Sequence, residues 1–270
     1  MPETLLNIED EVTQILSDLG VTTKLNEMDD FMNQNELKVQ ITNENAMVTG
    51  LVTYTCTVKD KDNSALANRI VEWYKGTTLV GLHATDSNGI ATFSHRVAEA
   101  DIYDVHALVR GTNAGDDIRM FVKDKDNILT HTQWSCGEFS NTVPGFNHVR
   151  AELSLNSDWC SKGDVSLKAV NLQNQNDGYI YITLNAEEYD AYTFNCKINN
   201  QGETSSVRLQ ALDSEDSASN LITVSTPTKQ ITPVELTGNI PEGYSKIRIT
   251  IHCVHGVVYI DDLCLKKINM

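Results

Sequence analysis

The sequence predicts a mainly β protein, with a short helical segment at the N-terminus and two β-sandwiches after it. From residue 37 onward, short runs alternate apolar and polar residues with the period of two that is typical of strands. Glycine, proline and Asn-Gly turn signals separate these runs. We therefore expect a helical oligomerisation or docking segment at residues 1–36, one sandwich at 37–125 and a second at 126–270.

The N-terminal segment carries a heptad pattern. Apolar residues recur at alternating spacings of three and four, at Leu5, Ile8, Val12, Ile15 and Leu19. This spacing places them on one face of a helix within residues 4–32. Because an isolated helix of about 15 residues is marginal in water, it needs a partner. That partner is either its own domain or copies of itself, and the second interpretation predicts a homotrimer.

The first sandwich is expected at residues 37–125. The run LVTYTCTVKD predicts a strand whose inward face holds Val52, Tyr54, Cys56 and Val58. Trp73 is expected in the core on the following run, RIVEWYKG. An Asn-Gly pair lies in the run DSNGIATF, residues 86–93, and predicts a tight turn there because a positive φ is cheap for these residues.

This segment resembles an immunoglobulin-like domain of the bacterial surface and phage kind. The matching features are Trp73 on the third strand, the DSNGIATF turn and strand, and Asp101-x-Tyr103 as a tyrosine corner. Val105 stands where antibody-type domains carry their second cysteine, so the resemblance implies no inter-sheet disulfide and a free thiol at Cys56. Domains of this kind are usually spacers or adhesion modules.

The second sandwich is expected at residues 126–270. Its predicted strands are DVSLKAV, GYIYITLN, YTFNCKIN, SSVRLQALDS, NLITVSTP, SKIRITIHCV and VVYIDDLCLKK, with glycines and prolines near the strand ends. The motif KDKDN occurs at 59–63 and again at 123–127. Both copies are interpreted as charged, solvated turns, the second one linking the two sandwiches.

The second segment resembles the carbohydrate-binding-module type of galactose-binding-like jelly roll. The resemblance rests on the opening WSCGEF at 134–139, the strand KGDVSLKAV, the pair YTFNCKINNQGETSSVRLQAL and the terminal GVVYIDDLCL. It implies a glycan-binding jelly roll. It also implies a structural calcium held by acids of the first and last strands, here Glu138 and Asp262, and oxygen ligands suit that ion. The alternative for these acids is a plain hydrogen bond.

Two neighbouring carboxylates, Asp261 and Asp262, lie in that last strand. Neighbours on a strand point to opposite faces unless a bulge intervenes, so the pair does not suit glycoside hydrolysis, which needs two carboxylates roughly 5–9 Å apart across one bond. We expect one of them to face inward and accept backbone N–H bonds. No motif of a nucleophile elbow, phosphate loop or metalloprotease is present, and the protein is expected not to be an enzyme.

Aromatic residues of the second segment are candidates for stacking against sugar rings. They are Trp159, Tyr179, Tyr181, Tyr189 and Tyr192. Tyr179 and Tyr181 are two residues apart on one predicted strand and so share a face. Core packing is the competing role for such residues.

Composition limits the partners and the compartment. The net charge of −16 argues against nucleic acid and anionic membrane surfaces, and no run reaches the roughly 20 apolar residues of a membrane span. The six cysteines match no metal or redox spacing, and most are expected to be reduced, with Cys136 and Cys264 the first pair to check. The acidic start lacks the features of a secretory signal, so we expect a mature form with an added Met or use without that export route.

These features together predict a non-catalytic phage virion protein: a head fibre, tail fibre or capsid decoration. It would be assembled in the host cytoplasm, lie on the virion surface beside other virion proteins and bind cell-surface or environmental glycans. The alternative is a cell-surface adhesin or a carbohydrate-binding accessory module of a secreted protein, with an extracellular or cell-surface location. A hydrolase with an unrecognised site is the third hypothesis.

Overall fold

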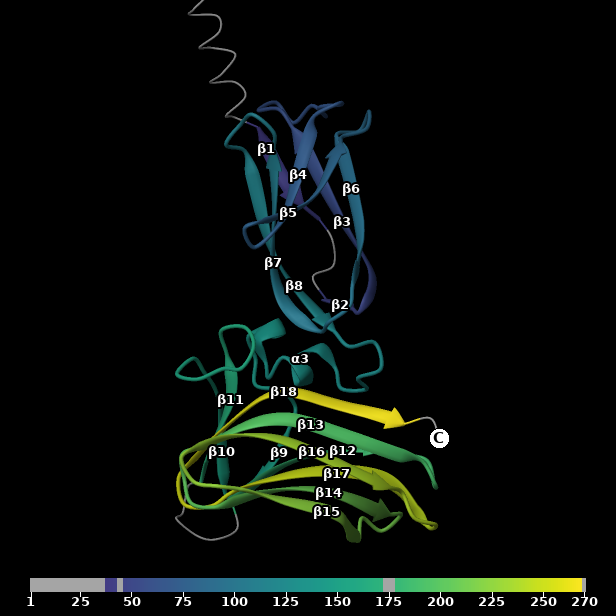
Figure 1. Cartoon of the computed structure of the whole chain (residues 1–270), viewed down its shortest axis with the longest axis vertical. Helices are drawn as coiled ribbons and strands as arrows, with labels where there is room; N and C mark the ends of the chain where they lie inside the picture. Colours follow the sequence, from purple (N-terminus) through teal and green to yellow (C-terminus); the bar gives the residue numbers. More distant parts are fainter. Residues whose placement is uncertain (1–36, 43–45, 172–177, 269–270) are drawn as a thin grey trace, which may run out of the picture. The chain divides into compact units, whose positions relative to one another are not determined.

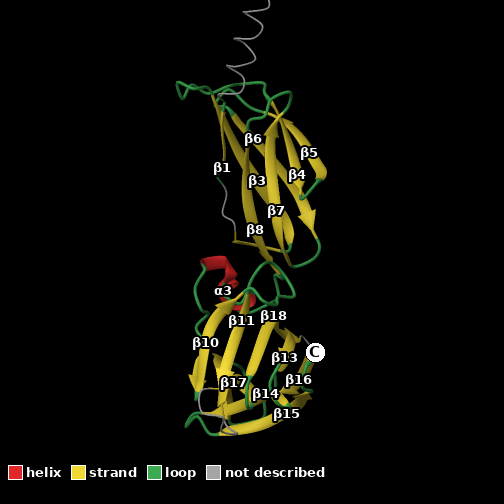
Figure 2. Ribbon diagram, turned by 90° about the vertical axis from the view of Figure 1, so that its left-hand side faces the viewer, coloured by secondary structure: helices red, strands yellow, loops and turns green. Residues whose placement is uncertain are grey.

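The computed structural model describes residues 37–42, 46–171 and 178–268. Strands account for nearly all of its regular structure, which confirms the mainly β, sandwich-like prediction (Figures 1 and 2). The helix predicted within residues 4–32 lies outside the described residues. Among those described, no helix is both apolar enough and long enough to cross a membrane.

The described chain divides into two compact units. The first holds residues 37–42, 51–95 and 103–119, and the second holds 46–50, 96–102, 120–171 and 178–268. Eight strands, β1 to β8, run through residues 38–123 and form two sheets. One sheet has the order β1 (Lys38–Ile41), β3 (Gly50–Lys59), β6 (Ile90–Val97). The other has the order β2 (Ala46–Val48), β8 (Gly115–Lys123), β7 (Asp101–Val109), β4 (Ile70–Lys75), β5 (Thr78–Ala84).

The core of the first unit follows the predicted alternation. The inward positions of β3 are Val52, Tyr54, Cys56 and Val58, and none is more than 1% exposed. Trp73 is fully buried, as predicted, and its ring lies 5.8 Å from that of Tyr54 and 6.0 Å from that of Phe93. These aromatic contacts fill the space between the sheets with large, well-fitting side chains.

The second unit is a sandwich of two five-stranded antiparallel sheets. The β18 sheet has the order β10 (Ala151–Asn156), β11 (Ser166–Asn171), β18 (Val257–Ile268), β13 (Ala191–Asn200), β16 (Gln230–Asn239). The β17 sheet has the order β15 (Ala218–Thr226), β14 (Ser205–Asp213), β17 (Tyr244–Cys253), β12 (Gly178–Asn185), β9 (Asn147–Val149). A short helix, α3 (His131–Trp134), and a 3-10 turn, η1 (Glu138–Ser140), precede the strands.

The two sheets of the second unit bury one continuous apolar core. In β17, Ile247, Ile249 and Ile251 are each at most 2% exposed, which confirms the alternation predicted for that run. Each buried isoleucine contributes roughly 1.5–3 kcal/mol relative to an exposed one. All seven strands predicted for this segment are present, with small differences at their ends.

Strands β9, β10 and β16 were not predicted, and Pro233, which was expected near a strand end, lies in the middle of β16. Pro233 pairs with Lys197 of β13, and β16 is the last strand of its sheet. A proline has no N–H to donate, which is harmless where the N–H side of an edge strand faces away from the sheet.

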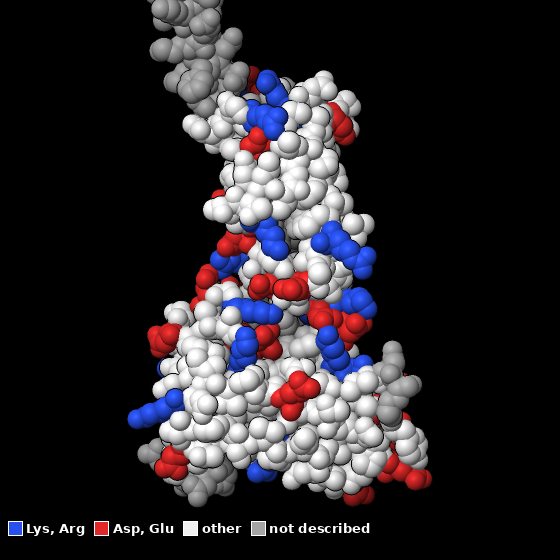
Figure 3. Space-filling model, in the orientation of Figure 1, with Lys and Arg blue, Asp and Glu red and all other residues white. Residues whose placement is uncertain are grey.

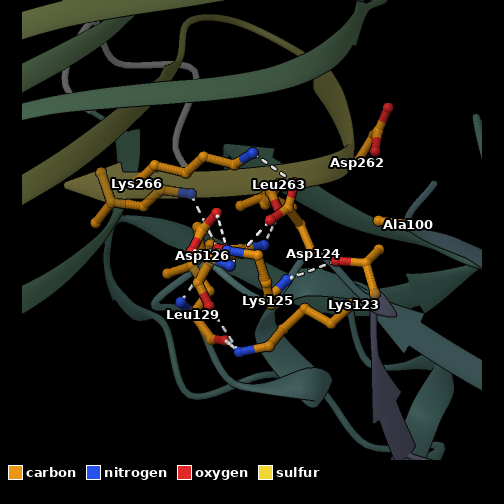
Figure 4. Close-up of polar contacts among 12 residues, drawn as sticks. Ala100, Lys123, Asp124, Lys125, Asp126, Leu129, Asp262, Leu263 and Lys266 are labelled. Carbon is orange, nitrogen blue, oxygen red and sulfur yellow. Dashed lines mark hydrogen bonds and ion pairs between the residues drawn. The ribbon is translucent and has the colours of Figure 1, made fainter. Parts of the chain in front are cut away.

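The second KDKDN segment, residues 123–127, is tied to β18. Asn127 is 2% exposed, and its side-chain amide donates to the carbonyl of Leu263 at 3.0 Å. Lys266 of β18 forms an ion pair with Asp124 (Figure 4). The interpretation of this copy as a charged, solvated turn holds for Lys125 and Asp126, which are exposed in a turn, but not for Asn127, which is buried.

Candidate functional site

Strand alternation leaves the outer face of the β17 sheet to aromatic and polar side chains. In β12, Ile180 and Ile182 are buried in the core, whereas Tyr179 and Tyr181 are half-buried on the other side. The prediction that the two tyrosines share a face is confirmed, because their ring centroids lie 6.0 Å apart. We call this surface the tyrosine face, formed by Tyr179, Tyr181, Thr183, Arg208, Gln210, Arg248, Thr250 and His252.

A histidine extends the aromatic part of the tyrosine face. His252 of β17 is paired with Tyr179 of β12 in the strand register, and the two ring centroids lie 5.4 Å apart. Both separations are within the range of favourable aromatic contacts. Three adjacent rings from two strands thus lie on the outer surface of one sheet.

Hydrogen-bonding groups flank these rings. The guanidinium of Arg248 lies 4.6 Å from the ring centroid of Tyr181, and its Nε donates to Thr183 Oγ1 at 3.0 Å. The hydroxyl of Thr250 donates to Gln210 Oε1 at 2.7 Å. The side chains around the tyrosines are therefore held in place by one another, which lowers the entropy cost of binding a ligand.

The outer face of the β18 sheet carries a smaller aromatic group. Trp159, which lies in the loop between β10 and β11, has its ring 6.5 Å from that of Tyr259 on β18. Lys168 of β11 lies 5.9 Å from the centroid of Tyr259. Sequence reasoning named Trp159 but not Tyr259, whose outward position follows from alternation in β18.

Tyr189 and Tyr192, the remaining candidates, belong neither to the tyrosine face nor to the group of Trp159 and Tyr259. Tyr189 is 62% exposed in the turn between β12 and β13, where its φ is +67°. Tyr192 is only 4% exposed and belongs to the core, and it also lines a cavity of about 390 Å³ with Ile128, Leu184 and Lys267. A ring this buried offers little surface for stacking.

Asp261 is buried at 2% exposure and holds the loop between β10 and β11. Its Oδ2 accepts the backbone N–H groups of Ser161 at 2.5 Å and Lys162 at 2.9 Å. This confirms the prediction that one aspartate faces inward and accepts backbone bonds. Burial raises the pKa of Asp261 to about 6, although the N–H groups of Lys162 and Ser161 oppose that shift.

Asp262 has a different environment because β18 bulges at this point. The pairing with β13 shifts register between Asn195 and Lys197, and Asp262 has a φ of +57°. Its carboxylate lies 3.1 Å from Lys162 Nζ and 3.6 Å from Lys197 Nζ. Simple alternation is therefore broken here, yet the two aspartates remain separate in role: one binds backbone amides and the other binds lysines.

Glu138, the second expected calcium ligand, accepts backbone N–H bonds. Its Oε2 lies 3.0 Å from the N of Asp164 and 3.3 Å from the N of Val165. Within residues 37–42, 46–171 and 178–268, no three His, Cys, Asp or Glu side chains gather as a metal site. Of the two interpretations of these acids, the plain hydrogen bond is present at Glu138, and the calcium is a hypothesis that the melting experiment below tests.

A cavity of about 330 Å³ lies where β13 and β16 meet the bulge, and both Asp262 and Glu235 line it. Two acids in one cavity are the feature that favours a hydrolase. Asp262, however, already has Lys162 and Lys197 as partners. Because its charge is already paired, Asp262 is not a free carboxylate that could act with Glu235 as a hydrolytic pair.

All six cysteines have free thiols, Cys136 and Cys264 included. Cys56 is buried, as predicted, and burial raises the pKa of its thiol to about 12. A thiol in this environment is inert packing material rather than a nucleophile.

Comparison with known proteins adds similarity at the level of the fold. No family model matches the sequence, and no curated protein matches it. A crystal structure of the enzymatically active domain of bacteriophage CBA120 tailspike protein 4 aligns with a TM-score of 0.43 and 13% identity. That alignment covers 55% of this chain but 22% of the tailspike chain.

Carbohydrate-binding modules are also similar. The C-terminal family 22 module of Clostridium thermocellum Xyn10B aligns with a TM-score of 0.40 and 16% identity, over 47% of this chain and 88% of the module. A structure from a study of carbohydrate-binding modules of the β-sandwich superfamily aligns with a TM-score of 0.34 and 14% identity, over 86% of this chain and 98% of its own. Because these scores are low, the function has to be argued from the chain's own surface.

The first prediction concerns Asp261. Its folded-state pKa of about 6 lies above the unfolded value of about 3.9, so the folded protein binds this proton more tightly. The contribution to stability is fully present below about pH 4 and is lost as pH rises through about 6. Relative to Asp261→Asn, the wild-type free energy of unfolding should fall by roughly 2–3 kcal/mol between about pH 4 and 7.

Urea unfolding of both proteins across this pH range measures the difference. Asp158→Asn, an exposed change in the same loop, is the matched control for the loss of one carboxylate. A wild-type to Asp261→Asn difference that stays constant with pH would contradict the assignment.

The second prediction concerns calcium. Lysine side chains already neutralise Asp262, and backbone amides satisfy Glu138. We therefore expect the melting temperature to be the same in EGTA and in excess calcium. Differential scanning calorimetry checks this, and a lower melting temperature in EGTA that calcium restores would support the structural ion instead.

Proposed function

We propose that the second unit binds glycans through the tyrosine face. The observation that carries this proposal is the outward pair Tyr179 and Tyr181, held beside Arg248, Thr250 and Gln210. Sugar rings present apolar C–H faces that stack on aromatic rings and hydroxyls that hydrogen-bond around their rim. The tyrosine face has rings that a sugar's C–H face would stack on, and beside them polar groups that its hydroxyls would hydrogen-bond to.

The proposed activity is binding without catalysis. Among the eight residues of the tyrosine face none is Asp or Glu, so this surface offers no carboxylate pair of the kind that glycoside hydrolysis uses. An open face of this sort binds a single sugar chain weakly. Useful affinity would then come from several copies acting together on one target.

For the whole chain we propose a phage virion protein: a head fibre, tail fibre or capsid decoration. Residues 37–125 would serve as an immunoglobulin-like spacer, and the heptads of residues 4–32 would join copies into a homotrimer. The six free thiols support assembly in a reducing cytoplasm, since disulfides form in oxidising compartments. The alternative remains a cell-surface adhesin or an accessory binding module of a secreted protein, which the same tyrosine face would suit.

The third prediction tests the binding face. Tyr179→Ala and Tyr181→Ala should each weaken glycan binding by about tenfold, because each removes a stacking ring worth on the order of 1 kcal/mol. A glycan array identifies the ligand, and isothermal titration of the best ligand measures the loss.

Matched aromatic substitutions elsewhere in the second unit serve as controls. Trp159→Ala and Tyr259→Ala remove the rings of the β18 sheet, and Tyr189→Ala removes an exposed ring in a turn. All three should bind like the wild type. Loss of binding in Trp159→Ala with full binding in Tyr179→Ala would move the site to the other sheet.

The fourth prediction tests self-association. Light scattering of the full chain should give three times the chain mass of 30.0 kDa. Ile8→Asp with Ile15→Asp places charges in the apolar seam of the predicted helix and should yield monomers. Asn7→Asp with Gln14→Glu adds the same charge outside the seam and should leave the trimer intact. A monomeric wild-type protein would contradict the proposed homotrimer and, with it, the proposed role as a fibre.

A further inference from the structure

The tyrosine face has a charge opposite to that of the protein. The chain has 37 Asp and Glu against 21 Lys and Arg, and on the side drawn in Figure 3 acidic and basic groups lie next to each other. The tyrosine face instead holds Arg208 and Arg248 together with His252, and no acid occupies any of its eight positions. Lys246, also on β17, is paired with Asp216 at 2.7 Å.

Arg208 has a hydrogen-bond donor that is buried and unused. Its Nε is buried and has no hydrogen-bond partner in the described part of the chain. A buried polar group without a partner costs on the order of 1–3 kcal/mol, so such groups are uncommon and call for an explanation. Because this atom is buried, a ligand would be bound by the terminal guanidinium nitrogens of Arg208 and not by Nε.

The two arginines lie close enough to act on one group. Arg208 of β14 is paired with Thr250 of β17, and Arg248 is two residues from Thr250 on the same side of the strand. Such diagonal neighbours have backbones roughly 7–8 Å apart, which long side chains bridge. Arg248 is also held above Tyr181 at 4.6 Å, so a sugar stacked on that ring would lie next to a guanidinium.

We propose that the glycan bound by this face is acidic, with a sugar carboxylate held by Arg208 and Arg248 while the ring stacks on Tyr181. The inference rests on the proposed glycan-binding function and adds the class of ligand. Arginine forms bidentate hydrogen bonds with carboxylates, and its charge makes them about twice as strong as neutral ones. A uronic acid and a nine-carbon acidic sugar both supply this carboxylate.

The overall charge favours carboxylated sugars over densely charged polymers. With a net charge of −16, the protein as a whole repels polyanions such as nucleic acid or heavily sulfated chains. A glycan with one carboxylate per repeat of several sugars brings less of this repulsion than a chain with several charges per repeat, and it still supplies the carboxylate for the two arginines.

The experiment uses the full chain with a panel of polysaccharides. Polygalacturonate represents uronic acids, polysialic acid represents nine-carbon acids, dextran sulfate represents dense polyanions, and a neutral glycan set completes the panel. The carboxyl-reduced form of each acidic polymer is the matched ligand. We expect a carboxylated polymer to bind, its reduced form to bind at least about tenfold more weakly, and added salt to weaken binding.

Variants then assign the site. Arg208→Gln should lose about tenfold or more in affinity for the carboxylated polymer, and Arg208→Lys should recover only part of it because the fork of donors is gone. Lys168→Gln removes the same charge from the β18 sheet and should bind like the wild type. Thermal melting of each variant confirms that it is folded.

The outcomes separate this inference from the proposed function. Binding to neutral glycans alone, unaffected by Arg208→Gln, would overturn the acidic ligand and leave glycan binding in place. Equal binding to dextran sulfate and to the carboxylated polymers would overturn it as well, because charge alone would explain the affinity. Binding to none of the glycans would overturn both.

Discussion

The period of two along each strand is the constraint on which the second unit depends. With two sheets packed face to face, every second residue is committed to the core, and the residues between them are free for other roles. In β12 the committed residues are Ile180 and Ile182, and the free ones are Tyr179 and Tyr181. The tyrosine face is the sum of such free positions over three neighbouring strands. The packing that commits Ile180 and Ile182 to the core therefore also places Tyr179 and Tyr181 on the outer surface of the sheet.

Polar groups that break the alternation have structural tasks. The bulge in β18 turns Asp261 inward, where it holds a loop through backbone amides, and leaves Asp262 to two lysines. Asn127 does the same for the segment before α3 by bonding to the backbone of β18. Asp261 and Asp262, whose adjacency in the sequence suggests catalysis, therefore stabilise the fold through backbone amides and lysines. Arg208 and Arg248 differ from these groups, because none of the eight positions of the tyrosine face holds an acid that could pair with them.

Sequence reasoning identified what depends on local pattern. The strands with clear alternation were predicted, as were the shared face of Tyr179 and Tyr181 and the inward aspartate. It did not predict β9, β10 or β16. Pro233 is tolerated within β16 because this strand lies at the edge of its sheet, and the local pattern does not reveal which strand is an edge. It did not place Arg208, Arg248 and His252 beside the tyrosines, because these residues come from strands that pair with β12 or with each other across long stretches of chain. Outward polar residues from different strands can be recognised as neighbours only when the order of the strands in the sheet is known.

The central claim is that the outer face of the β17 sheet is the binding surface. Backbone amide chemical shifts of the full chain, recorded with increasing amounts of the best-bound oligosaccharide, test it most directly. The account predicts that the perturbed amides lie in β12, β14 and β17, around Tyr181, Arg208 and Thr250. Perturbations confined to Trp159 and Tyr259, or to the cavity beside Tyr192, would contradict it.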